Sequence, residues 1–348
     1  MGMHRITHTA AAVASHLALL VLTVSCGIGP QERPDVPQLV VQGFLTPGKP
    51  VTGIEIRHTL PPDEYYEDIH LFEDREKLFI SGALVTITHR DSVYRLAERT
   101  DSAGVGVYEN LDVDIVAGET YRLEVRYEDP EIGTHHVRAE TTVPHPVTHQ
   151  EWELSLTQVF RQLRYGFRPA LDTLIFPKEL ADPLLFPPTE PDVARPFELR
   201  WEPSPDAAAI LVGAQSRDTS GAHILRDTDW ERWLVGDLQQ GRMRAFTRTN
   251  GFAVHKDTTS ADIFWALIRY SGPFTIGAMA IDRNYWDYYR TTGSPSGPDT
   301  GNDWDAGTRI NIEGGVGVFG SYAWPTDTLR SRVEKEYDPV TRRLISVF

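Results

Sequence analysis

The strongest constraint on the fold is the alternation of apolar and polar residues in short segments. In TYRLEVRYE, residues 120–128, the side chains at 121, 123, 125 and 127 lie on one side of an extended chain. Two pairs of such segments have the spacing of β-hairpins, namely 83–89 with 93–99 and 120–128 with 135–143. Together with the strand-like segments at 39–46 and 51–59, they predict an immunoglobulin-like β-sandwich over residues 38–146.

The rest of the chain is less regular but also favours strands. A length of 348 residues suits two domains, and the prolines of VPHPVTHQEW (143–152) mark a boundary, so residues 147–348 are predicted to form a second β-rich domain. Within it we expect paired strands in 197–216, a second pair in 262–282, and a short helix at 283–292. The fold class predicted for the whole chain is therefore all-β.

The N-terminus has the features of an export signal with a lipid anchor. Residues 1–25 contain Arg5 and then an apolar run that is too short to span a bilayer. Cys26, the single cysteine, directly follows Ser25, and this stretch resembles the site at which bacterial lipoproteins are cut and acylated. We predict a signal peptide over 1–25, acylation of Cys26 with palmitate, and a lipidated tether over 26–37.

The net charge disfavours nucleic acid as a partner, and the aromatic residues suggest binding of a ligand or another protein. A formal charge of −15 disfavours nucleic acid and a polybasic membrane patch. The long acidic and aromatic segment at 60–79 is a candidate partner-binding loop, or else a solvated insertion. The residues proposed to contact a ligand or partner are Tyr65, Tyr66 and Phe72 in this loop and Trp286 in the expected helix, where the tyrosines at 285, 288 and 289 would instead face the core.

Glycines near the C-terminus match the sequence motif of a phosphate-binding loop. Gly315, Gly317 and Gly320 spell G-x-G-x-x-G, but the following SYAWPTD cannot begin a helix, which a dinucleotide site requires. We therefore predict that Gly314 and these three glycines serve packing and backbone geometry, and that the chain uses no cofactor.

Other motifs support chemistry less well. His89–Asp91 has the letters of a kinase loop but the spacing of a hairpin turn, and the histidines at 135, 136, 145 and 149 are interpreted as solvated rather than metal-binding. Asp299, Asp303 and Asp305 could bind Ca²⁺ or form a polar turn, and this alternative stays open. Neither G-x-S-x-G nor H-E-x-x-H occurs in the sequence, and we expect no enzyme and no catalytic residues.

Several segments together carry a family resemblance. NIEGGVGVFGSYA (311–323), PQLVVQGFLT (37–46), ISGALVTIT (80–88) and IDRNYWDYYRTT (281–292) resemble domain-of-unknown-function family 4249, over roughly residues 37–325. The residues of its signature are Asn311, Gly314, Gly315, Gly317, Phe319 and Gly320. The resemblance implies an envelope lipoprotein of Bacteroidota-like bacteria, with no known activity, often found beside TonB-dependent outer-membrane transporters.

Together, the N-terminal signal and the family resemblance imply a non-catalytic lipoprotein of the outer membrane, facing the periplasm or the cell surface. Its expected role is to bind a ligand or a partner as an accessory of TonB-dependent uptake. Two alternatives remain open at this level: a hydrolase that acts on glycans or peptides, and a structural adhesin-like module.

The lipid anchor gives a direct prediction. Substituting Cys26 by Ala removes the thiol that would be acylated, so the variant should incorporate no labelled palmitate, whereas the parent chain should be labelled. The measurement is metabolic labelling with a palmitate analogue, followed by gel fluorography. Equal labelling of the two chains would disprove acylation at this residue.

Overall fold

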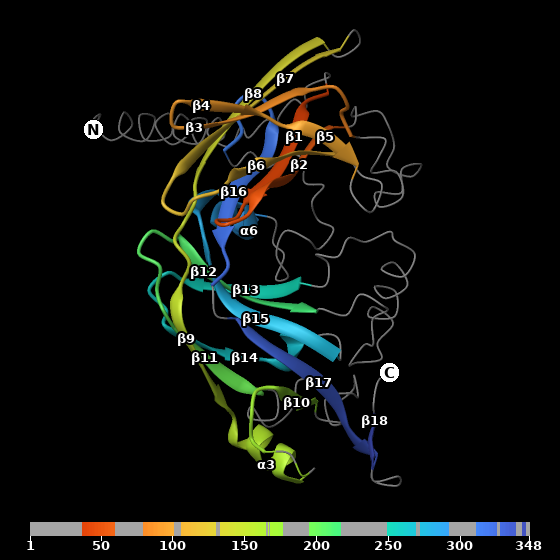
Figure 1. Ribbon diagram of the computed structural model, residues 1–348, viewed down its shortest axis with the longest axis vertical. Helices are drawn as coiled ribbons and strands as arrows, with labels where there is room; N and C mark the ends of the chain where they lie inside the picture. Colours follow the sequence, from red (N-terminus) through yellow and green to blue (C-terminus); the bar gives the residue numbers. More distant parts are fainter. Residues whose placement is uncertain are drawn as a thin grey trace, which may run out of the picture.

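A computed structural model describes much of the chain, and its strands and helices are shown in Figure 1. The described residues are 37–59, 79–100, 106–129, 133–164, 166, 168–176, 195–216, 249–268, 272–291, 311–325, 328–338 and 343–345. Several predicted features lie outside these residues: Cys26 and its tether, the loop with Tyr65, Tyr66 and Phe72, and the segment with Asp299, Asp303 and Asp305.

The N-terminal part forms two facing sheets, which we call the N-terminal sandwich. One sheet has the order β16-β1-β2-β6-β5, and the other has the order β4-β3-β7-β8. Its strands are β1 (Leu39–Leu45), β2 (Pro50–His58), β3 (Leu84–His89), β4 (Ser92–Arg95), β5 (Ala97–Thr100), β6 (Gly106–Asp114), β7 (Thr120–Asp129), β8 (Gly133–Thr142) and, from far along the chain, β16 (Val316–Ala323). Both expected hairpins are present, as the antiparallel pairs β3–β4 and β7–β8. The second strand of the first hairpin is shorter than predicted, because residues 97–99 belong to β5, which pairs with β6 in the facing sheet.

Alternation along the strands builds the core of this sandwich. Tyr121, Leu123 and Val125 of β7 are buried, as the pattern predicted, and they pack with the inward residues of β1, β2 and β3. Phe319 of β16 and Ile312 just before it belong to the same core. The N-terminal sandwich therefore encloses side chains that come from the last part of the described chain.

The C-terminal part has a sheet of β10, β17, β15, β12 and β13 and a smaller sheet of order β14-β11-β9. Buried side chains of both sheets form one further hydrophobic core. The elements are β9 (Thr148–Leu154), α3 (Leu156–Arg164), β10 (Thr173–Phe176), β11 (Phe197–Glu202), β12 (Ala209–Ser216), β13 (Thr249–His255), β14 (Ser260–Ile263), η5 (Trp265–Leu267), β15 (Gly272–Ile281), α6 (Arg283–Thr291), β17 (Leu329–Asp338) and β18 (Arg343–Ile345). The predicted all-β class is confirmed, and the short helix expected at 283–292 is α6.

The strand pairing expected in this part is wrong. β11 pairs with β9 and β14, whereas β12 pairs with β13 and β15, so the two strands within 197–216 belong to different sheets. The same holds for β14 and β15 within 262–282. Two buried strands joined by a short connection can form a hairpin or can cross between facing sheets, and their apolar pattern is the same in both cases.

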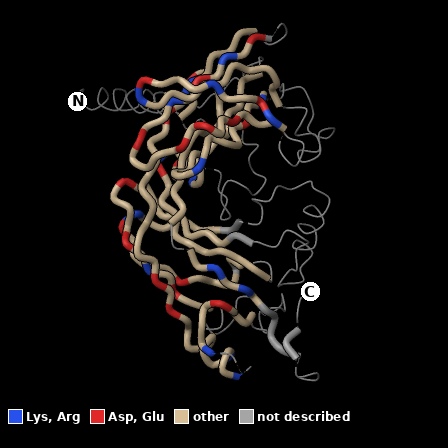
Figure 2. Tube along the Cα trace, in the orientation of Figure 1, with Lys and Arg blue, Asp and Glu red and all other residues tan. Residues whose placement is uncertain are grey.

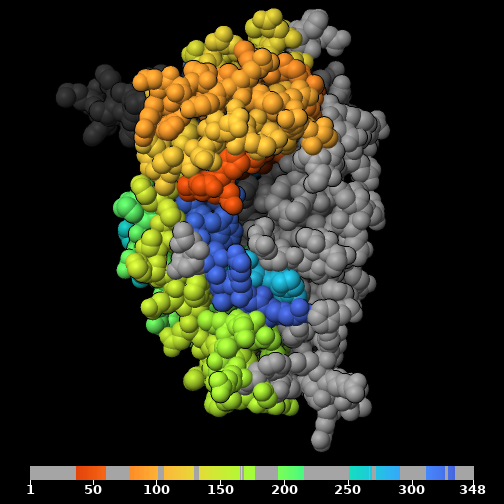
Figure 3. Space-filling model, in the orientation of Figure 1, coloured from red at the N-terminus to blue at the C-terminus, as the bar shows by residue number. Residues whose placement is uncertain are grey.

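β16 connects the two parts. It runs parallel to β1, from Val40 beside Val316 to Leu45 beside Ser321, and its last residues pair antiparallel with the end of β15. In Figure 3 the blue surface of the C-terminal segment lies directly against the red surface of β1. One sheet therefore continues through both parts of the molecule. The division into domains at 146/147 stays a prediction.

The parallel approach of β16 to β1 depends on Gly317. Its φ is +107°, and a Cβ at this position would overlap the carbonyl oxygen of Val41. A side chain there would therefore meet two penalties at once, backbone strain and contact with an unyielding strand.

We predict that Gly317→Ala lowers the free energy of unfolding by roughly 3 kcal/mol, because it must separate β1 from β16. The matched control is Gly53→Ala: its φ is +70°, but nothing lies within 4 Å of its Cβ position. That variant should lose only about 1 kcal/mol. Urea unfolding of both variants gives the comparison; equal losses, or nucleotide binding by the parent protein, would contradict a packing role for Gly317.

Candidate binding site around α6 and β16

The residues of the predicted signature come together where α6, β8 and β16 meet. Asn311 donates from its side-chain amide to the carbonyl oxygens of Glu140 (2.8 Å) and Phe319 (2.6 Å), and accepts from the Phe319 backbone N–H at 3.0 Å. Asn284 of α6 donates to the same two carbonyl oxygens. The two asparagine side chains thus fix the end of β8, the middle of β16 and the start of α6 relative to one another.

A buried carboxyl group lies at the centre of this junction. Asp282 directly precedes α6, and one of its oxygens accepts the Tyr285 backbone N–H at 2.7 Å, which caps the helix. Its other oxygen accepts the hydroxyl of Thr141 from β8, and that hydroxyl lies 3.0 Å from the Ser321 hydroxyl of β16. Asp282 is only 5% exposed. Burial raises its pKa to about 6, against the opposing effect of the hydrogen bonds from Thr141, Tyr285 and Ser321.

The signature glycines allow close contacts along β16, and one of them, Gly320, lies beside this carboxyl group. Gly314 has a φ of +79° and turns the chain against the backbone of His136. A Cβ on Gly315 would lie 2.7 Å from the Leu39 carbonyl oxygen, and one on Gly320 would lie 3.2 Å from Asp282 Oδ1. The G-x-G-x-x-G letters therefore run into and along β16, a strand, and not into a helix N-terminus.

Aromatic side chains cover the outer surface of the junction. Tyr285 is buried and contacts Phe44 of β1, with ring centres 4.6 Å apart. Trp286 and Tyr289 are half-buried and stack at 6.0 Å, and the Arg290 guanidinium lies 5.4 Å from the Trp286 ring centre. We call the half-buried aromatic residues of this surface the α6 aromatic patch; they are Phe44, Trp286, Tyr289, Tyr322 and Trp324.

The helical-face prediction for α6 is partly correct. Tyr285 and Tyr288 are buried, as expected, but Tyr289 is only half-buried. Trp286 was expected to point away from the tyrosines, whereas it stacks on Tyr289 and packs against the same cluster. Burial raises the pKa of Tyr289, whose phenol oxygen also hydrogen-bonds with the backbone of Ala253. Trp286 is therefore held in place by its contacts with Tyr289 and the cluster beneath it.

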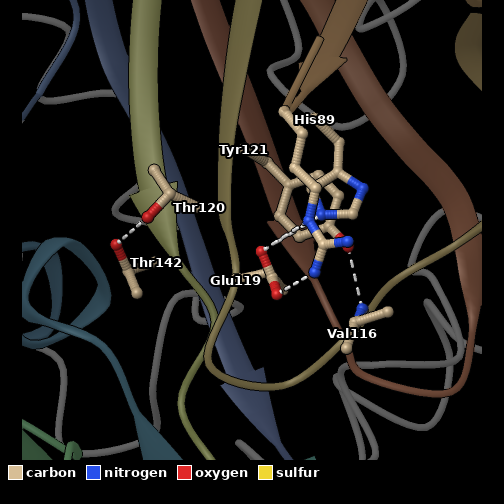
Figure 4. A network of polar contacts seen from close by, with 7 residues as sticks. His89, Val116, Glu119, Thr120, Tyr121 and Thr142 are labelled. Carbon is tan, nitrogen blue, oxygen red and sulfur yellow. Dashed lines mark hydrogen bonds and ion pairs between the residues drawn. The ribbon is translucent and has the colours of Figure 1, made fainter. Parts of the chain in front are cut away.

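The His89–Asp91 motif lies at the C-terminal end of β3, where two of its side chains form part of a network of polar contacts (Figure 4). The His89 imidazole and the Arg90 guanidinium both bind the carboxylate of Glu119, and hydrogen bonding to Arg90 lowers the pKa of Glu119. Tyr121 stacks beneath His89 at 4.6 Å and accepts the Val116 backbone N–H. The hairpin-turn interpretation is confirmed, because β3 and β4 pair on either side of Arg90.

Three of the four histidines considered as metal ligands, His136, His145 and His149, also contact carboxylates. His136 pairs with Glu124, and His145 contacts Asp206 through Nδ1 at 2.8 Å. Within the described ranges, no three His, Cys, Asp or Glu residues are grouped so that they could hold a metal ion. Nor does any helix among those residues have the length and apolar character to cross a membrane.

The sequence did not reveal Asp282, Thr141, Ser321 and Asn284 as members of one site. An aspartate just before an expected helix is a capping signal that could have identified Asp282. Nothing local indicates that Thr141 and Ser321 lie beside it, because the contact requires β8 and β16 to be neighbours.

Comparison with known proteins identifies the family. The family model described as "Domain of unknown function (DUF4249)" matches residues 28–328, so the chain belongs to this family, which has no assigned function. No curated protein matches. A solved structure, "Crystal structure of chicken CNTN1 FN1-FN3 domains", is similar at 11% identity and a TM-score of 0.22 over 70% of this chain; the match spans 60% of that chain.

The buried Asp282 predicts an unusual pH dependence. The pKa of Asp282 in the folded protein, about 6, exceeds its ordinary value of 3.8. Between these two pH values the folded protein therefore keeps a proton that the unfolded chain has lost. The stabilising effect is present below pH 3.8 and disappears as the pH rises through about 6, a change of about 3 kcal/mol at 1.36 kcal/mol per unit. Asp282→Asn should therefore gain stability relative to the parent by about that amount between pH 4 and about 7.

The control is Asp287→Asn in the same helix. Burial opposes ionisation of Asp287, but hydrogen bonds from Arg283 and Arg290 outweigh it and lower its pKa, so its effect has the opposite sign. Denaturant unfolding at a series of pH values measures both. Parallel pH profiles for the parent and Asp282→Asn would show that the carboxyl group titrates normally.

Proposed function

We propose that the chain is a non-catalytic lipoprotein of the cell envelope that binds a ligand or partner and assists TonB-dependent uptake across the outer membrane. The observation that carries the binding role is the α6 aromatic patch. The membrane location rests on Cys26 after its apolar run, and the link to uptake rests on the resemblance to family 4249.

The chemistry of the patch suits recognition. Tryptophan and tyrosine rings contribute large contact areas with few rotatable bonds, so little conformational entropy is lost when a partner covers them. Arg290 lies over Trp286 and is held by Asp287, which places a charge beside the rings. Apolar faces with an adjacent charged group favour a partner that has both an apolar surface and polar groups, such as a sugar ring or a protein loop.

The support beneath the patch reduces the cost of binding further. Asp282 caps the first turn of α6 and accepts the Thr141 hydroxyl of β8 through buried hydrogen bonds, and Asn284 joins the same turn to β8 and β16. A helix fixed in this way presents its rings in one arrangement before the partner arrives. In this proposal the buried carboxyl group acts as a helix cap that orients the binding surface.

The patch can be tested with a pull-down. The tagged protein is used to capture proteins from detergent-solubilised outer membranes, and mass spectrometry identifies any TonB-dependent transporter. Trp286→Ala should reduce recovery of the transporter roughly tenfold, because it removes a central aromatic contact. Phe264→Ala is the control, since Phe264 is a partly exposed aromatic residue outside the patch.

The loop at 63–77 is tested in the same experiment by deletion. If neither the parent nor the deletion variant captures a transporter, the uptake role is wrong. If both capture it equally, the loop with Tyr65, Tyr66 and Phe72 has no part in binding. Equal recovery with Trp286→Ala and Phe264→Ala would remove the α6 aromatic patch from the proposal.

A further inference from the structure

Helix α3 has the reverse of the usual amphipathic arrangement, because its polar residues face the protein. Gln158 and Gln162 are buried. The Gln158 amide donates to the Ile175 carbonyl oxygen at 2.7 Å and accepts the Ile175 N–H at 3.2 Å. Gln162 likewise binds the backbone of Ala170 and Thr173. The two glutamine side chains thus attach α3 to β10 and to the segment before it, because their amide groups hydrogen-bond with backbone N–H and C=O groups there.

The apolar residues of α3 face outwards. Leu156, Phe160 and Leu163 are 74%, 68% and 53% exposed. They recur at intervals of four and three residues, which places them on one face of the helix, opposite the two glutamines. Single exposed apolar residues are common on proteins, but three that form one stripe on a firmly attached helix indicate a contact surface.

The charged residues within the segment that contains α3 are all of one sign. Residues 154–171 contain three arginines, at 161, 164 and 168, and neither Asp nor Glu, in a chain whose net charge is −15. Arg164 and Arg168 are exposed. In Figure 2 the tube at α3 is blue and tan, whereas red segments occur on the strands above it. The described part of α3 and the residues just after it therefore combine exposed apolar side chains with exposed basic ones.

We propose that α3 is an interfacial helix whose stripe of Leu156, Phe160 and Leu163 enters the headgroup region of an anionic lipid surface. Leucine and phenylalanine on one face, arginine beside them and low overall hydrophobicity are the features of helices that lie in this region. The exposed Arg164 and Arg168 contact lipid phosphates, and the apolar side chains supply the hydrophobic contribution.

Electrostatics favours this partner over a second copy of the chain. Packing α3 on its symmetry mate would bring arginines together without an acidic residue from either helix. The negative charge of the whole protein does not prevent contact with an anionic surface, because charges more than about 8–10 Å from the lipid are largely screened at physiological ionic strength.

The test measures binding of the mature chain, carrying Cys26→Ala so that no acyl group contributes, to sedimented vesicles. The parent should bind vesicles of equimolar phosphatidylcholine and phosphatidylglycerol more tightly than vesicles of phosphatidylcholine alone, and high salt should remove the difference. The double variant Leu156→Ser with Phe160→Ser should bind at least about tenfold more weakly to the anionic vesicles.

The matched control is Val93→Ser with Leu111→Ser, which removes two side chains that are 66% and 61% exposed on the N-terminal sandwich. Circular dichroism should show both double variants folded, since every substituted side chain is exposed. Arg164→Gln with Arg168→Gln should remove the preference for anionic vesicles. No vesicle binding by the parent, or equal binding by the two serine variants, overturns the proposal. A dimer in light scattering that only the α3 serine variant abolishes also overturns it, in favour of self-association.

Discussion

The parallel pairing between β1 and β16 closes the N-terminal sandwich with a strand from the far end of the described chain. Phe319 and Ile312 enter the same core as Leu39 and Val41, so this core is incomplete until the last part of the chain has folded. A contact between segments so distant in sequence carries a large loop-closure cost, and topologies of this kind fold slowly. Loss of β16 would therefore affect both parts of the molecule.

Polar groups set the register at this closure. A shift of β16 along β1 by two residues would keep the same side chains facing the core. It would, however, separate the buried Ser321 hydroxyl from Thr141 and from the Thr142 carbonyl oxygen, and would move the Phe319 carbonyl oxygen away from Asn284. The raised pKa of Asp282 reflects the energetic cost of this arrangement. Buried networks of this kind contribute less to stability than apolar packing does, and they are best explained as devices that select one arrangement.

Local features of the fold could be predicted, and long-range ones could not. The hairpins β3–β4 and β7–β8 follow from alternation and turn spacing, because each pairs neighbouring segments. The crossing between β11 and β12 has no separate sequence signal, and neither has the parallel pairing of β16. Glycine content indicated that backbone geometry mattered near Gly317, but the neighbour that requires it, Val41, is fixed only by the tertiary structure. In an ordinary amphipathic helix Leu156 and Phe160 would face the core. In α3 they are exposed, because the glutamines face the protein and hydrogen-bond with its backbone.

The two proposed contact surfaces place limits on how the molecule could lie at a membrane. α3 lies at one end of the long axis, and the N-terminal sandwich, which follows the predicted tether in the sequence, lies towards the other (Figure 1). If the acyl group and α3 bound the same bilayer, the long axis would lie along the surface instead of projecting from it. When two weak contacts are linked, the first raises the effective concentration of the second. The anchor at Cys26 would therefore increase the fraction of molecules in which α3 is bound to the membrane, without changing the intrinsic affinity of α3 for lipid. Helix α6, which carries part of the aromatic patch, lies near the middle of the long axis in Figure 1 and would then be held close to the membrane, within reach of a transporter embedded in it.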